Sequence, residues 1–346
     1  MTHVSYAGPI TLLDLLTHAA GFSYGFLGDC GVAFAYREQG LELPCRLTAH
    51  VDRDPSVPPV ADLREFVSRL NAIPLAAHPG ERFQYSVATD VLGRVVEAVS
   101  EMPLGEYFRT RIFANAGMSD TSFTLDRSEI GRLSACHASG EVCEGRRSLR
   151  FADCTEVLPH DGVGDLEYDR CGWREDNALC PSGGGGLLST TDDMVRFAEA
   201  LRTDQLLSQT SAAEMRRDHL APRGVRKESL AQGYEGFGLG VWTTTTTQAQ
   251  RSEASSSGKA AASPVLAIAP AALGAGGWGG AAGTGLLVDP KHGLSVIITT
   301  QLLGYHLVAP TFRADLFRAA YNLFPDLATH EPPPACDEPS HVGFSG

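Results

Sequence analysis

One tyrosine, Tyr85, lies where its phenol could act as a base. It follows the turn dipeptide Pro79-Gly80 and precedes apolar residues spaced as on one face of a helix. A hydroxyl at a helix N-terminus is close to backbone N–H groups and to the positive end of the helix dipole, which favour a phenolate. Tyr85 is therefore a candidate general base, and the alternative is an amphipathic tyrosine that closes a core. The expected helical face consists of Val87, Val91, Leu92, Val95, Val96 and Val99.

A second pattern makes Ser23 a candidate nucleophile. Residues 21–25 match G-x-S-x-G, which in α/β hydrolases is a strained turn between a strand and a helix. Here the segment follows an expected helix and runs into residues with no helical pattern. The order of elements therefore argues against a nucleophilic Ser23.

A glycine-rich loop, Ser182 to Gly186, leads into a helix expected to begin near Thr191. Such a loop can hold an anion against the helix N-terminus, or it can allow two backbone segments to approach closely. No strand pattern precedes it and no Lys-Ser/Thr pair ends it, so we expect a close backbone approach.

The elements that must position these residues follow from hydrophobic periodicity. The first expected helix covers residues 10–18 and begins with Thr11 and Asp14 in a capping-box arrangement. Further helices are expected at 61–72, 103–113 and 307–323, the last with Phe312, Leu316, Phe317 and Ala320 toward the core. Strands are expected at 236–243, 276–290 and 294–300, with a turn at 289–293.

Composition excludes several classes of function. The chain has 346 residues, 43% of them hydrophobic and 20% charged, which is typical of a globular protein. Its net charge of −13 repels nucleic acids and anionic lipid surfaces, so no nucleic-acid partner is expected. No apolar run is long enough for a membrane span.

The eight cysteines show neither a C-x-x-C pair nor a Cys/His cluster at zinc spacing, so we expect no metal site and no cofactor. No secretory signal stands at the N-terminus. Free thiols in a cytoplasmic protein are therefore expected.

Taken together, these pieces resemble the serine beta-lactamase-related family, which includes class C beta-lactamases, family VIII carboxylesterases and D-alanyl-D-alanine peptidases. The match is collinear over most of residues 10–322. The residues that carry it are Ile10 to His18 with Gly21, Pro79 to Ser86, Asp90 to Gly93, Ile112-Phe113 with Gly117 to Thr121, Ser182 to Thr190, Phe237 to Gly240, and Trp278-Gly279-Gly280 with Asp289-Pro290.

The resemblance implies roles for specific residues. Tyr85 looks like the family's proton-shuttle tyrosine, and Trp278-Gly279-Gly280 looks like the triplet on the strand beside the pocket, with the N–H of Ala281 as a candidate oxyanion-hole donor. Glycines suit this strand because a substrate carbonyl must lie against its backbone with no Cβ in the way.

Two departures from the family pattern change the expected activity. Val87 stands where the family usually has an asparagine that contacts substrate, which favours simple esters over beta-lactams. The family's Ser-x-x-Lys nucleophile motif is absent ahead of residue 10, and the one literal match, Ser256 to Lys259, lies in a low-complexity insert. Neither Ser256 nor Ser23 is expected to be the nucleophile.

The resemblance implies an α+β fold of the beta-lactamase/transpeptidase type, an antiparallel sheet flanked by helices plus a mostly helical subdomain, without its N-terminal strands and nucleophile helix. We expect one domain over 1–325, with a helical part at roughly 10–220, C-terminal strands and helix at roughly 235–323, an insert at 244–275 and a disordered tail at 326–346.

Two functions follow from the resemblance. The first is a serine hydrolase of an ester or amide, present here as an N-terminally truncated chain without its nucleophile. The second is a non-catalytic member that serves as a binding or assembly protein. The sequence specifies neither the substrate nor an oligomeric state, and it assigns no role to residues 119–182.

Overall fold

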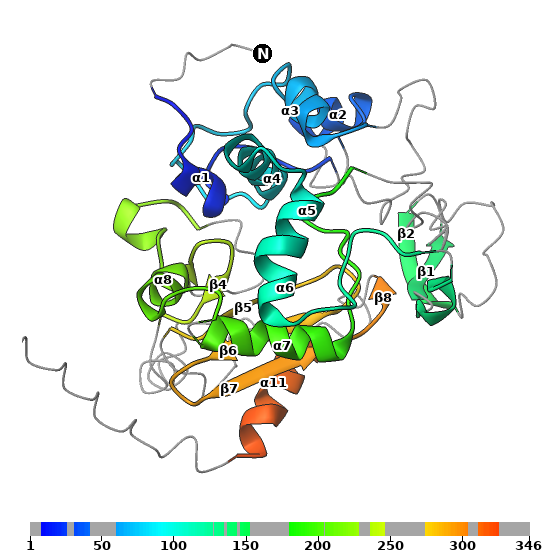
Figure 1. Cartoon of the computed structure of the whole chain (residues 1–346). Helices are drawn as coiled ribbons and strands as arrows, with labels where there is room; N and C mark the ends of the chain where they lie inside the picture. Colours follow the sequence, from blue (N-terminus) through cyan, green and yellow to red (C-terminus); the bar gives the residue numbers. More distant parts are fainter. Residues whose placement is uncertain are drawn as a thin grey trace, which may run out of the picture.

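The molecule places a group of helices at one end and a five-stranded sheet with two covering helices at the other (Figure 1). The computed structural model describes residues 8–25, 31–41, 60–126, 128–134, 137–143, 146–152, 180–203, 205–227, 236–245, 274–303 and 311–324. Most of the expected insert and the whole expected tail lie outside these residues, as do Ser256 and Lys259. The arrangement is α+β, as the sequence predicts.

The N-terminal helices begin at the residues that the sequence indicates. Helix α1 (Leu12–Leu16) is capped by Thr11, which forms a full capping box with Asp14. Helix α2 (Gly31–Glu38), which the sequence analysis did not anticipate, and helix α3 (Leu63–Leu70) pack with α1 and α4 (Ala88–Ser100). The shared core of these four helices includes Leu15, Tyr36 and Phe66.

Helix α4 turns most of the expected face inward, with Val87, Val91 and Leu92 in or against the core of the helical end and Val96 against a neighbouring cluster. Its buried residues are Ala88, Asp90 and Gly93, whereas Val99 is 81% exposed. The side chains of Leu63 and Leu104 close on Gly93, so helices α3 and α5 approach α4 where there is no side chain. The contact face of α4 therefore combines these small residues with the expected apolar ones, apart from Val99.

The following helical segment runs continuously from Leu104 to Ala116. It consists of α5 (Leu104–Phe108), a π-helical turn (Arg109–Phe113) and α6 (Ala114–Ala116). It begins after Pro103 and ends at Gly117, whose φ of 71° is the left-handed conformation that favours glycine. Both boundaries agree with the sequence prediction.

The main sheet is antiparallel, with the strand order β3-β4-β5-β6-β7. Its strands are β3 (Gly236–Phe237), β4 (Trp242–Thr243), β5 (Gly276–Gly279), β6 (Gly285–Asp289) and β7 (Leu294–Ile298). Ser295 of β7 bonds to Glu199 of helix α7 (Thr191–Arg202), whereas Ile298 lies beside Gly285 and Arg313 of helix α11 (Phe312–Asn322). Because odd and even residues of a strand face opposite sides, the two helices cover opposite faces.

Two of the expected strands are hairpins. Residues 236–243 fold into β3 and β4 because Gly240, with φ of 78°, makes a turn closed by the Gly238 N–H bond to Val241 O. Residues 276–290 likewise divide into β5 and β6 at a turn around Gly283, where φ is 84°. Strand β7 pairs with β6 after the 289–293 turn, as predicted.

A separate three-stranded sheet contains β1 (His137–Cys143), β2 (Arg146–Ala152) and β8 (Leu302–Leu303). Strands β1 and β2 are antiparallel and lie within the range expected to be mainly helical, whereas β1 and β8 are parallel. Residues 153–179 lie outside the described part of the chain.

Helix α11 buries Ala314, Phe317 and Tyr321. Leu316, which was expected to face the core, is 39% exposed. The helix is instead anchored by the Tyr321 hydroxyl, which donates to the buried Asp289 carboxylate at 2.5 Å. Helix α8 (Gln209–Met215) ends beside the turn between β3 and β4, where the Leu239 N–H donates to Met215 O at 2.8 Å.

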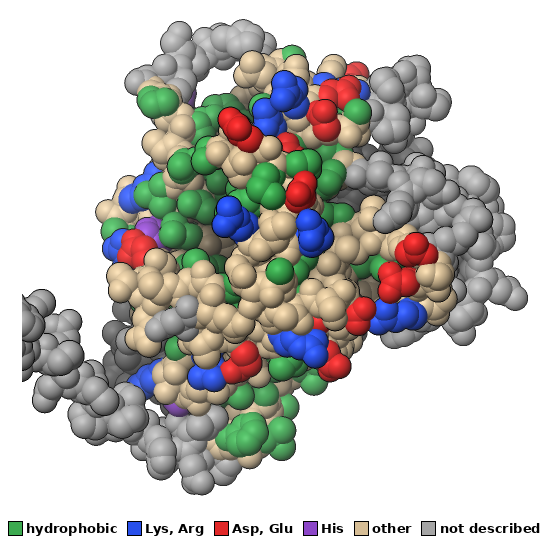
Figure 2. Space-filling view, in the orientation of Figure 1, with side chains coloured by type: hydrophobic (Ala, Val, Ile, Leu, Met, Phe, Trp, Pro, Cys, Tyr) green, Lys and Arg blue, Asp and Glu red, His purple; other side chains and the backbone are tan. Residues whose placement is uncertain are grey.

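Acidic and basic side chains are interspersed with apolar ones on the face seen in Figure 2. Within the described residues, no helix has both the length and the apolar character that crossing a membrane requires.

Candidate active site

Tyr85 lies between the helices and the sheet, three residues before helix α4 begins. The backbone around it pairs with the end of the first helical segment. The Gly80 N–H donates to Ala19 O and the Gln84 N–H donates to His18 O, each at 2.8 Å. Gly80 has a φ of 77°, so the turn requires the left-handed conformation that glycine adopts readily. These hydrogen bonds fix the backbone on the N-terminal side of Tyr85.

The structure brings Tyr85 and Trp278 together from distant parts of the sequence. Their ring centroids are 5.5 Å apart, and Trp278 also lies 5.5 Å from Phe237 at a nearly perpendicular angle. Trp278 projects from strand β5 on the face opposite Gly279. Tyr85 and Trp278, both predicted from the sequence, therefore lie side by side.

Side chains are excluded at both glycines of the triplet by neighbouring protein side chains, which is a different reason from the expected approach of a substrate. A Cβ on Gly279 would lie 2.3 Å from the guanidinium carbon of Arg313, and one on Gly280 would lie 2.3 Å from Thr284 Oγ1. Arg313 also donates to Gly280 O at 2.8 Å. Ala281 follows in the exposed turn between β5 and β6, and its role as an oxyanion-hole donor stays a prediction.

His18 is a member of the site that the sequence analysis did not single out. Its ring is packed among aromatic rings, with centroid distances of 4.9 Å to Tyr85, 5.6 Å to Phe237 and 6.5 Å to Trp278. Burial lowers the pKa of His18 to about 3, so the ring is neutral near pH 7. Its Nδ1 lies 3.4 Å from Ser86 Oγ.

The backbone of His18 has a φ of 50°, an uncommon value for a residue other than glycine. The Gln84 N–H bond to His18 O and the ring contact with Tyr85 stabilise this conformation of His18. Its position in the Leu-Leu-Thr-His segment is the one sequence signal that pointed to it.

Tyr24 and Asp90 lie behind Tyr85 and were also not identified as site residues from the sequence. The rings of Tyr24 and Tyr85 have centroids 5.0 Å apart. Burial, followed by the nearby Tyr85 and Asp90, raises the pKa of Tyr24 well above its usual value. Burial also raises the pKa of Asp90 to about 6, although the Ser182 and Gly184 hydrogen bonds oppose this shift.

The glycine-rich loop approaches helix α4 as closely as the sequence analysis expected. A Cβ on Gly183 would lie 2.0 Å from Thr89 O, so a side chain there is excluded. The loop also holds a carboxylate of the protein itself, because Ser182 Oγ and the Gly184 N–H both donate to Asp90 Oδ1.

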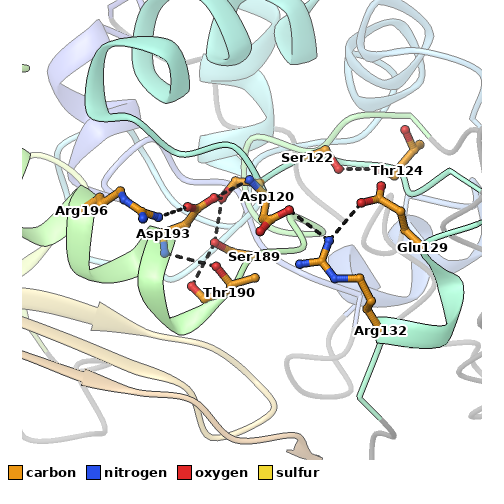
Figure 3. Close-up of polar contacts among 10 residues, drawn as sticks. Asp120, Ser122, Thr124, Glu129, Arg132, Ser189, Thr190, Asp193 and Arg196 are labelled. Atoms are coloured by element: carbon orange, nitrogen blue, oxygen red, sulfur yellow. Dashed lines mark hydrogen bonds and ion pairs between the residues drawn. The ribbon is translucent and has the colours of Figure 1, made fainter.

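The far end of this loop is fixed by a second polar network, shown in Figure 3. Residues Ser122 and Leu188 exchange two backbone hydrogen bonds of 3.1 and 2.8 Å. Asp193 of α7 accepts from the Asp120 N–H at 2.7 Å and from Thr121 Oγ1 at 2.8 Å. These contacts fix the helix that follows the loop and thereby the loop over Asp90.

The serines near the site are not accessible. Ser23 is fully buried, and its Oγ lies 3.4 Å from the carbonyl oxygen of the next residue, which contradicts a G-x-S-x-G nucleophile. Ser86, beside Tyr85, is also fully buried. Neither Ser23 nor Ser86 is therefore exposed to a substrate.

Comparison with known proteins gives a consistent result. The family model described as "Beta-lactamase" matches residues 2–319. Esterase EstB of Burkholderia gladioli is 31% identical over 296 residues, which are 84% of this chain and 64% of EstB. Protein Rv1367c of Mycobacterium tuberculosis is 28% identical over 301 residues, and a lovastatin esterase of Penicillium rubens is 28% identical over 229 residues. The chain covers 62% and 48% of these two relatives, so it spans less than two thirds of each of the three.

Solved structures show the same fold. The simvastatin synthase LovD from Aspergillus terreus superimposes with a TM-score of 0.62 at 20% identity, covering 92% of this chain and 70% of LovD. EstCE1, a hydrolase with promiscuous acyltransferase activity, superimposes with a TM-score of 0.57 at 24% identity, covering 90% of this chain and 72% of EstCE1. At these identities the likeness establishes the architecture.

Proposed function

This chain belongs to the beta-lactamase family, and we propose that it forms the proton-transfer and substrate-binding part of an ester-directed serine hydrolase. The observation that carries the proposal is the meeting of Tyr85 with Trp278 between the helical part and the sheet. The esterases among its relatives support the same reaction class.

In the proposed reaction, a serine hydroxyl attacks the carbonyl carbon of the ester and Tyr85 accepts the hydroxyl proton. The same proton passes to the departing alkoxide, which leaves as an alcohol, and the acyl group stays on the serine. Water then attacks the acyl-enzyme and loses a proton to Tyr85, which passes it to the departing serine oxygen as the acid is released. We propose the Ala281 N–H as a donor to the oxyanion in both steps.

The preference for esters over beta-lactams rests on Val87. Its side chain is fully buried and packs with Leu15 and Phe66 in the helical core. This position therefore offers no amide to a substrate, and the polar recognition that the family's asparagine gives is lost. We propose that an apolar acyl chain packs against the partly buried ring of Trp278.

The nucleophile is the incomplete part of the proposal. In the first form, the chain works with a Ser-x-x-Lys serine that the described residues do not contain, as in an N-terminally truncated hydrolase. In the second form, the pocket has no nucleophile and serves as a binding or assembly surface. The one literal Ser-x-x-Lys match, at 256–259, lies in the low-complexity insert and is not expected to supply the nucleophile.

Labelling with a fluorophosphonate followed by peptide mapping distinguishes these forms. The protein is purified at its full natural length and assayed in parallel for hydrolysis of p-nitrophenyl butyrate. The hydrolase form predicts one labelled serine other than Ser256 that has a lysine three residues later, and unchanged labelling in the matched control Ser23→Ala. Label on Ser23 or Ser256 would contradict the assignment of the site, and no label with no hydrolysis would establish the non-catalytic form.

A further inference from the structure

Asp90 is a buried carboxyl group that the reaction described above does not use. It is fully buried at the third residue of helix α4. Its Oδ1 accepts hydrogen bonds from Ser182 Oγ at 2.5 Å and from the Gly184 N–H at 3.3 Å. Its Oδ2 is buried without a hydrogen-bond partner, and Asp90 forms no ion pair with any described residue. A buried polar atom in this state is uncommon and calls for a reason.

Asp90 Oδ2 and the hydroxyl of Tyr24 lie near the same side of Gly184. A Cβ built on Gly184 would lie 3.0 Å from Asp90 Oδ2, 3.3 Å from Tyr24 Oη and 2.9 Å from Thr89 Oγ1. The three oxygen atoms therefore converge on the one side of Gly184 that has no side chain. Glycine at this position keeps the carboxyl group and the phenol in the same small space.

Tyr24 in turn contacts the proposed proton-transfer residue. Its ring lies 5.0 Å from that of Tyr85, and the pKa of Tyr24 responds to both Tyr85 and Asp90. Among the described residues, the polar groups near Asp90 are hydroxyls, backbone N–H groups and the buried Cys180 thiol, whose pKa is raised to about 12 by burial and by Asp90. Tyr85, Tyr24 and Asp90 therefore follow one another from the Trp278 ring into the core, and among the described residues no donor lies within hydrogen-bonding distance of Asp90 Oδ2.

We propose that Asp90 is the final proton acceptor behind Tyr85, reached through Tyr24; this inference rests on the proposed hydrolase function. When Tyr85 Oη takes the proton of the attacking hydroxyl, the Tyr85 proton moves to Tyr24 Oη and the Tyr24 proton moves to Asp90 Oδ2. One proton is transferred in total, and both tyrosines end neutral. The return of the proton along the same path delivers it to the leaving alkoxide.

The acidity of Asp90 supports this role. Burial raises its pKa to about 6, so near pH 7 the carboxylate is ionised yet takes up a proton readily. Tyr24 remains a neutral phenol at this pH because its own pKa is raised.

Infrared difference spectroscopy across a pH titration tests the contact without requiring turnover. The unmodified protein is expected to show the C=O band of a protonated, buried carboxylic acid, lost with an apparent pKa near 6. Asp90→Asn should remove the band, and Tyr24→Phe should shift its frequency. The matched control Asp14→Asn, which changes another buried aspartate, should leave the band unchanged. A band that survives Asp90→Asn, or that keeps its frequency in Tyr24→Phe, would overturn the proposal.

Kinetics test the catalytic part. In p-nitrophenyl butyrate hydrolysis, kcat should rise with pH with an apparent pKa near 6, and Asp90→Asn should abolish this limb and lower kcat about 100-fold with KM nearly unchanged. An unchanged pH profile in Asp90→Asn would refute the proton-acceptor role. If the unmodified protein shows no hydrolysis, the hydrolase function fails and the acceptor role fails with it, whereas the infrared result still decides whether Asp90 and Tyr24 are in contact.

Discussion

Two fully buried aspartates occupy the same position in two helices and have opposite surroundings. Asp90 is the third residue of α4, and Asp193 is the third residue of α7. Helix α7 has a side-chain cap from Thr190, and both oxygens of Asp193 have partners, including Arg196 at 2.8 Å. Helix α4 has no side-chain cap, and one oxygen of Asp90 has no partner.

The difference shows that the surroundings of a buried aspartate determine how readily its carboxylate takes up a proton. Both carboxylates gain from the positive end of a helix dipole. At Asp193 the remaining cost of burying a charge is offset by donors from the 120–121 segment and by an arginine (Figure 3). At Asp90 that cost is only partly offset, which leaves a carboxylate that takes up a proton readily.

Replacing the structural aspartate should have the largest effect on stability. Asp193→Ala removes a buried acceptor and leaves the Asp120 N–H and the Thr121 hydroxyl without their partner. We expect the free energy of unfolding to fall by about 3–5 kcal/mol. Urea denaturation at pH 7 measures this loss, and a change below about 1 kcal/mol would contradict a structural role for Asp193.

Replacing the other aspartate should act in the opposite direction and depend on pH. The folded-state pKa of Asp90, about 6, exceeds the unfolded value near 3.8, so its protonation stabilises the fold below pH 4 and this contribution is lost as pH rises through 6. Asp90→Asn should therefore match the unmodified protein near pH 4 and exceed its free energy of unfolding by up to about 3 kcal/mol at pH 8. Urea titrations at both pH values measure the difference, and a destabilised variant at pH 8 would contradict this account.

The smallest effect is expected from the arginine that pairs with Asp193. The Arg196 side chain is 48% exposed, so solvent screens its ion pair. Arg196→Ala should lower the free energy of unfolding by no more than about 1 kcal/mol, since the backbone and hydroxyl donors to Asp193 remain. A loss as large as that of Asp193→Ala would show that the ion pair, rather than these donors, holds the carboxylate.

Local sequence signals predicted the helices well because their ends depend on nearby residues. Thr11 with Asp14 and the glycine at position 117 define helix boundaries through contacts within a few residues. The predicted strands were less accurate. Alternating apolar residues at 236–243 gave no indication that Gly240 would reverse the chain and pair Phe237 with Trp242.

The site was predicted in part. Tyr85 and Trp278 were proposed as site residues because the family resemblance placed both beside one pocket; the structure brings their rings together, and their roles stay predictions. His18, Tyr24 and Asp90 were not, because their properties arise from burial by segments far away in the sequence. In the sequence, Asp90 resembles any helix residue, because the 182–184 loop that contacts it is about 90 residues away along the chain.

The central claim is that Tyr85 transfers the proton in ester hydrolysis, and the most direct measurement compares kcat and KM of the natural protein with those of Tyr85→Phe on p-nitrophenyl butyrate. We expect kcat to fall about 10²–10⁴-fold while KM changes little, because the phenyl ring keeps its packing against Trp278. Tyr107→Phe, which changes a tyrosine of helix α5, should keep the original kcat. Retention of kcat in Tyr85→Phe, or absence of hydrolysis in the natural protein, would contradict the claim.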